Sequence, residues 1–133
     1  MIAMETKVEI VVAVAMFVVA LSHLLRPRAW VEFFKMLEAK GDPGVFIVAL
    51  LHLPIGVLIV AFHNRWGGWP TVVTVVGWGW LIKGMLYLTF PRVGMFWLRR
   101  LSVERSREFV VAGFALLILA GLVAIPLLRP MIG

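Results

Sequence analysis

Four long runs of apolar residues divide this chain, and short polar segments separate them. The runs cover residues 8–25, 44–62, 71–90 and 109–128. Each is close to the ~20 residues that an α-helix needs to cross ~30 Å of hydrocarbon. The pattern therefore predicts an all-α integral membrane protein, in which a bundle of four transmembrane helices forms a single domain over residues 1–133.

The segment after the first apolar run is amphipathic. Beyond Pro27, which ends the first span, apolar residues recur at steps of three and four: Trp30, Phe33, Phe34 and Leu37. Charged residues lie between them. A helix with this pattern lies in the plane of the lipid headgroups. We expect one interfacial helix here, and a second after Pro91, where apolar and basic residues are mixed again.

The two halves of the chain resemble each other at an offset of 64 residues. Pro27-Arg28 falls on Pro91-Arg92, and four pairs of small residues coincide: Ala13 with Gly77, Ala20 with Gly84, Ala49 with Gly113, and Gly56 with Ala120. This predicts two tandem two-helix repeats, about residues 1–66 and 67–133, related by an axis along the membrane normal. The alternative is that membrane helices are rich in Gly and Ala, so that the agreement is coincidental.

Charge gives the orientation. The net charge is +6, and nine of the thirteen Lys and Arg residues lie in the two links that join spans one to two and three to four. Only three lie on the other side. The positive-inside rule therefore predicts cytoplasmic links, so that both interfacial helices are cytoplasmic and both termini extracytoplasmic, in a multi-pass protein of the bacterial inner membrane.

The same basic residues suggest a lipid partner. Arginines gather at one membrane surface: Arg26, Arg28, Arg92, Arg99 and Arg100. Each basic residue near anionic headgroups contributes about 1 kcal/mol of binding. We therefore expect anionic lipid at the cytoplasmic face. The membrane accounts for the positive charge, so no nucleic-acid partner is expected.

Few polar side chains lie within the spans, and these are the first candidates for function. His52 and Lys83 are predicted at similar depth, His63 returns to nearly the same face of its helix as His52, and Tyr87 follows Lys83 by one turn. One hypothesis is an interior polar track that passes protons or binds an anionic headgroup. Alternatively, Lys83 extends toward the headgroups, His63 is interfacial, and His52 bonds a backbone carbonyl.

Other polar and aromatic residues are expected at the interfaces as anchors. His23 closes the first span, and Asn64, Trp66 and Trp69 follow the second. Tryptophan is enriched at membrane–water boundaries because one end of its ring system is apolar and the other carries a polar N–H.

Catalytic and metal signatures are missing from the sequence. There is no cysteine, no Ser–His–Asp arrangement, no phosphate-binding glycine loop and no zinc spacing. We also expect no acidic side chain inside the membrane, which removes the carboxylate ligands of membrane metal sites. No metal and no cofactor is therefore expected. Haem between His23 and His52 is disfavoured because their depths differ by roughly 8–10 Å.

One resemblance follows from particular motifs. The run His63-Asn64-x-Trp66, then Thr74-x-x-Gly77-Trp78 and Lys83-Gly84, closed by Pro91, resembles a group of small, uncharacterised four-helix bacterial inner-membrane proteins. The overall plan is similar to that of DoxX-like proteins. The first resemblance implies no function. The second implies a membrane subunit associated with redox complexes.

Together these features favour a non-enzymatic subunit or scaffold of a membrane assembly. Its partner would be a second copy or a larger complex, and the last span, which carries Gly113, Ala120, Gly121 and Ala124, would form the contact. Two alternatives stay open: a small transporter or lipid-binding protein that uses His52 and Lys83, and a redox-associated subunit.

Overall fold

A computed structural model describes the backbone of residues 1–132 and the side chains up to Pro130. Within these residues the secondary structure is entirely helical. The helices, in chain order, are α1 (Met4–Leu25), α2 (Pro27–Ala39), α3 (Asp42–Phe62), α4 (Thr71–Thr89), α5 (Pro91–Leu98), the short 3-10 helix η1 (Val103–Arg105) and α6 (Arg107–Ile132).

Four of the described helices, α1, α3, α4 and α6, are long and apolar enough to cross a membrane. They match the four predicted spans closely. The largest differences are at the first and last spans, because α1 begins at Met4 and α6 ends at Ile132. The prediction of a small all-helical membrane protein with four spans is therefore supported.

Proline and glycine define the ends of the short connecting helices. Pro27 and Pro91 each occupy the first turn of a helix, where a missing N–H leaves no hydrogen bond unmade. Gly41, with φ of 67°, reverses the chain between α2 and α3. Gly67 and Gly68 also have positive φ and form the tight turn before α4.

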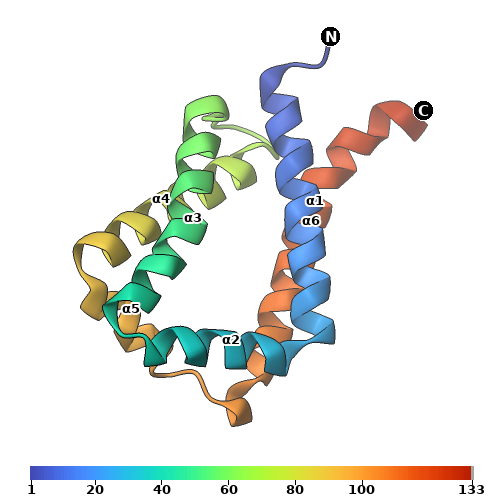
Figure 1. Cartoon of the computed structure of the whole chain (residues 1–133). Coiled ribbons are helices and arrows are strands. Elements are labelled where there is room, and N and C mark those ends of the chain that lie inside the picture. The colour runs from blue at the N-terminus through green and yellow to red at the C-terminus, as the bar shows by residue number, and fades with distance from the viewer. Residues whose placement is uncertain (133) are drawn as a thin grey trace.

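The four long helices associate as two pairs. Helix α3 packs along α4, and α1 packs along α6, whereas direct contacts between the pairs are few. Figure 1 shows the pairs standing apart, with α2 lying across their lower ends and both termini at the opposite end. We call these the α2 end and the terminal end. The four spans therefore form two closely packed pairs.

Glycine allows α3 and α4 to approach closely. A Cβ placed on Gly56 would lie 2.4 Å from the backbone nitrogen of Leu81, and one on Gly84 would lie 2.5 Å from the Cβ of Leu53. Gly77 is similarly covered by Ile59. No larger side chain fits at these positions unless the helices separate, which is the packing that small residues provide in membranes.

The pair formed by α1 and α6 uses alanine more than glycine. Ala20 is fully buried, and its carbonyl oxygen would lie 3.1 Å from a Cβ placed on Gly113. Ala13 and Ala120 are also buried. Ala20 and Gly84 therefore both lie at close helix contacts, as the sequence predicts.

Two separate apolar clusters hold the fold together. The cluster at the terminal end joins all four long helices and includes Met16, Ile59, Val73 and Val123. The cluster at the α2 end includes Leu37, Val45, Tyr87 and Leu98 and joins α2, α3, α4 and α5.

The second interfacial segment is shorter than predicted. Helix α2 has 13 residues, but α5 has only eight, and an irregular stretch and η1 follow it. At Gly94 the α5 backbone lies close to Val45 and the ring of Tyr87.

Candidate functional sites

The structure brings His52 and Lys83 together across the α3–α4 contact. The Nζ atom of Lys83 lies 3.3 Å from Nε2 of His52, and both side chains are half-buried. The Nδ1 atom of His52 lies 2.7 Å from the carbonyl oxygen of Val48, one turn earlier in α3. We call this pair the inner site.

The hydrogen bonds at the inner site define the roles of its atoms. A backbone carbonyl only accepts, so Nδ1 of His52 carries the proton and donates to Val48. Nε2 of His52 is then left as an acceptor for the ammonium of Lys83. Lysine has three N–H donors. No carboxylate among the described residues lies within ion-pairing distance of Lys83.

Aromatic rings flank the inner site on both sides along α4. The ammonium of Lys83 lies 5.6 Å from the centre of the Tyr87 ring, and the ring centres of His52 and Trp80 are 6.1 Å apart. Trp80 packs on the cluster at the terminal end, whereas Tyr87 belongs to the cluster at the α2 end. The inner site therefore lies between the two apolar clusters.

A second polar group lies at the terminal end, where the two helix pairs meet. His63 is fully buried, and its Nε2 lies 2.8 Å from Oε1 of Glu9 in α1. The Nδ1 of His63 lies 3.3 Å from the hydroxyl of Thr74 in α4. We call Glu9, His63 and Thr74 the junction site, because it links α1 to α3 and α4.

His63, a candidate for the interior polar site, is fully buried, and its ring contacts Glu9 of α1. One expectation is corrected at the junction site. Glu9 is an acidic side chain within a span, and only 11% of its side chain is exposed. Sequence reasoning missed Glu9 although a signal was present. It lies on the same helical face as the buried Val12, Ala13 and Met16, at steps of three, four and seven residues.

Further polar contacts surround the junction site. Arg65 pairs with Glu5 at 3.3 Å between side chains that are about half exposed. The side-chain oxygen of Asn64 accepts hydrogen bonds from the indole N–H groups of Trp66, at 3.1 Å, and Trp78, at 3.2 Å. Trp66 and Trp69 are both exposed.

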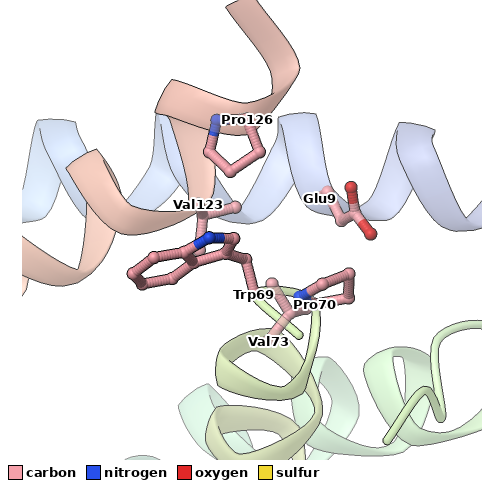
Figure 2. A pocket seen from close by; sticks show the side chains of 6 residues that line it. All are labelled: Glu9, Trp69, Pro70, Val73, Val123 and Pro126. Carbon is pink, nitrogen blue, oxygen red and sulfur yellow. The ribbon is translucent and has the colours of Figure 1, made fainter. Parts of the chain in front are cut away.

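A small cavity of about 20 Å³ reaches Glu9, which leaves room for about one water molecule. Figure 2 shows Glu9 from α1, Val123 and Pro126 from α6, and Trp69 and Val73 beside the start of α4 around it. The cavity lies where residues of the two helix pairs face each other.

The two sites are not joined into one polar track. His52 and His63 are eleven residues apart, or roughly 16 Å along α3. Between them Gly56 and Ile59 are buried against α4, and no hydrogen bond among the described residues links the two sites. A track through His63, His52, Lys83 and Tyr87 is therefore interrupted by apolar packing.

The remaining candidates lie at the α2 end. His23 is buried, with its ring stacked on Trp30 at 4.4 Å and its Nδ1 bonded to the carbonyl of Val19. The basic residues expected to meet lipid are all exposed at this end of the molecule: Arg26, Arg28, Arg92, Arg99 and Arg100. The guanidinium of Arg100 also lies 4.5 Å from the centre of the Phe96 ring.

Neither site resembles a metal centre. The described residues contain no group of three or more His, Cys, Asp or Glu side chains that could hold a metal ion. The inner site presents a cation with free donors, and the junction site presents an acid, a base and a hydroxyl in mutual contact.

Comparison of the chain with protein-family models, curated proteins and solved structures finds no match.

Proposed function

We propose that this chain is a non-enzymatic subunit of a membrane assembly, and that α6 associates with a second copy of the chain. The observation that carries this proposal is the poor burial of α6. Only 17% of the residues in its most apolar stretch are buried within the chain, against 28% in each of the other spans. A helix that packs on one neighbour leaves most of its surface for lipid or protein.

Gly121 marks the surface of α6 that we assign to the partner. Gly113 and Ala120, which the sequence also favoured for this contact, are buried against other parts of the chain. A Cβ on Gly121, in contrast, would meet no atom within 4 Å. Exposed Phe114, Ile118 and Ile125 lie at helical spacing on either side of it. Close approach of helices at such small residues stabilises association in lipid.

The test is the mass of the purified protein in detergent. Gly121→Leu should convert the oligomer to a monomer in light scattering. Ala115→Leu, on the same helix but about a third of a turn away, should leave the mass unchanged. An unchanged mass for Gly121→Leu, or a monomeric parent protein, would refute association through α6.

A second candidate function is the binding of an anionic amphiphile at the inner site, as in a lipid-binding protein or small transporter. What favours it is the cation of Lys83, which has one nitrogen acceptor and no carboxylate partner among the described residues. A carboxylate or phosphate headgroup would supply the missing charge. Charged side chains in spans commonly mark such sites.

Native mass spectrometry tests this candidate. Lys83→Met should reduce retention of a fatty acid by about tenfold or more, the effect of losing one charge-assisted hydrogen bond. Tyr87→Phe keeps the ring beside the ammonium and should retain the ligand. Equal retention by Lys83→Met and the parent would exclude the site.

We also propose that the protein lies in the bacterial inner membrane with both termini outside and the α2 end at the cytoplasm. The exposed arginines of the α2 end support this orientation. They also support bound anionic lipid. Reporter fusions at the C-terminus should behave as extracytoplasmic, and fusions after residue 40 or 100 as cytoplasmic. A cytoplasmic C-terminus would reverse the orientation.

The internal repeat remains our proposal and has structural support. At an offset of 64 residues, the pair α3 and α4 corresponds to the pair α6 and α1, and both pairs are closely packed. The corresponding Ala20 and Gly84 lie in the two contacts. An experimental structure should superpose residues 8–62 on 72–126 by rotation about the membrane normal, and an inverted relation would refute duplication.

A further inference from the structure

The junction site has no role in either function proposed above. We propose that Glu9 and His63 together bind one proton, which they share in a hydrogen bond of net zero charge, and that this proton keeps the two helix pairs joined at the terminal end. The ligand of the site is therefore a proton.

The hydroxyl of Thr74 has one proton to donate and two lone pairs that can accept. Its oxygen lies 2.7 Å from the carbonyl oxygen of Arg65 and 3.4 Å from the carbonyl oxygen of His63, so Arg65 is the nearer acceptor. Two oxygens lie this close only when a proton is between them, and a carbonyl has none. The proton of Thr74 is therefore committed to Arg65.

The lone pairs of Thr74 then accept. One accepts from the backbone N–H of Arg65 at 3.0 Å. The other faces Nδ1 of His63 at 3.3 Å, so Nδ1 must carry a proton and donate it. This uses the full hydrogen-bonding capacity of the hydroxyl. A His63 with a bare Nδ1 would oppose its lone pair to that of Thr74.

The protonated Nδ1 determines what lies between His63 and Glu9. If Nε2 is bare, the 2.8 Å contact with Oε1 of Glu9 requires a proton on the carboxyl group. If Nε2 is also protonated, the contact is an imidazolium–carboxylate pair. Both forms contain the same number of protons and have zero net charge. A neutral imidazole beside a bare carboxylate would contain one proton fewer and a net charge of −1.

Burial favours the protonated form of the Glu9–His63 pair, whose net charge is zero. His63 is fully buried and the Glu9 side chain is 11% exposed, so an uncompensated charge here would be costly. The other charged side chains at the terminal end of the adjoining helices are Glu5 and Lys7 on α1, Arg65 after α3, and Arg129 near the end of α6. The remaining titratable groups of these helices lie farther toward the α2 end: His23, Asp42, His52, Lys83, Tyr87, Arg107 and Glu108. Glu5 and Arg65 pair with each other, and Lys7 and Arg129 are exposed.

Removal of the shared proton should therefore weaken the joint. At high pH the buried pair would hold a bare negative charge, and the contact between α1 and α3 would lose its neutral hydrogen bond. This contact is one of few between the helix pairs. Loss of the proton should leave the apolar cluster as the main contact between the terminal ends and so populate a state in which they separate, with α2 still connecting the pairs at the other end.

Nitrogen-15 NMR tests the protonation directly. The double variant His23→Gln, His52→Gln leaves His63 as the sole histidine without altering the junction site. Nδ1 of His63 should be protonated at neutral pH, and Nε2 should show a shift typical of a shared proton. A spectrum with Nδ1 bare and only Nε2 protonated would overturn the proposal.

Distances between spin labels test whether the terminal ends of the two helix pairs separate when the proton is lost. The chain has no cysteine, so labels can be placed at exposed Val11 on α1 and Val75 on α4. In the otherwise unchanged protein, one distance is expected at pH 6 and an added longer one at pH 10. Glu9→Gln, whose amide N–H donates to Nε2 without a charge, should keep the short distance at both pH values.

Glu5→Gln is the matched control, because it breaks the exposed pair with Arg65 and leaves the shared proton in place. It should open at pH 10 like the parent protein. The proposal fails if the parent does not respond to pH, if Glu9→Gln opens as the parent does, or if Glu5→Gln alone removes the response.

Discussion

The inner site lies between α3 and α4 and the junction site lies where α1 meets the end of α3 and the start of α4, and the hydrogen bonding of the two sites differs. At the junction site, both ring nitrogens of His63 have partners from other helices, and the ring is fully buried. At the inner site, Lys83 has one nitrogen acceptor and no carboxylate, and both members are only half-buried.

This difference is the one that we expect between a structural contact and a ligand-binding site. Polar groups taken out of water are stable where all their hydrogen bonds are made, and such groups hold elements together. A charged group within a span that has unused hydrogen-bond donors can bind a ligand, lipid headgroups or water. We therefore expect the junction site to control stability and the inner site to control binding.

The largest expected effect is that of His63→Leu. This change leaves Glu9 buried without its partner, and loss of one member of a buried pair typically costs about 3–5 kcal/mol. The free energy of unfolding in mixed micelles measures it. The matched variant His52→Leu removes the hydrogen bond to Val48 and the nitrogen acceptor of Lys83, but both side chains are only half-buried, so it should cost less, about 1–2 kcal/mol. Equal costs for the two histidines would remove the distinction between the sites.

Gly84→Leu should have the next largest effect, and it acts on the inner site. The new side chain would collide with Leu53, next to His52, and force α3 from α4. Overpacking of this kind costs about 1–3 kcal/mol. Gly79→Leu is the control, because a side chain there meets no atom within 4 Å. If both variants unfold alike, the close α3–α4 contact is not what positions Lys83.

Asn64→Ala should have a smaller effect, at the rim of the junction site. It removes the acceptor shared by the indoles of Trp66 and Trp78, which are both exposed. Water can replace a lost partner at an exposed site, so a cost of about 1 kcal/mol or less is expected. Thermal unfolding in detergent gives the comparison with His63→Leu. A rim variant as damaging as His63→Leu would contradict the central role of the buried pair.

The smallest expected effect concerns lipid at the α2 end. Arg99→Gln should weaken binding to anionic vesicles by about 1 kcal/mol at low salt and by less at physiological salt. Glu104→Gln should not weaken it. Affinity for vesicles with and without anionic lipid, at two salt concentrations, provides the measurement. A preference that does not change with salt would argue against headgroup charge as its cause.

The sequence anticipated one site better than the other, and the reason is physical. His52 and Lys83 stand out because each is a lone polar residue within an apolar run, and their depths follow from counting along two adjacent spans. Glu9 and His63 lie near the ends of their helices, where polar residues usually face water. Only the position of α1 beside α3 shows that they are buried together.

The sequence itself determined three features of the fold: the four apolar spans, the small residues on their contact faces, and the corners that begin with proline. Each depends on a local property, namely the length of an apolar run, its helical periodicity, or the geometry of the proline ring. The tertiary structure alone decided that α1 pairs with α6 and α3 with α4. It also decided that Gly113 and Gly121 differ in role, and that a glutamate, a histidine and a threonine from three helices share one site. These features depend on which helix faces meet, and many arrangements of four similar apolar helices satisfy the same local rules.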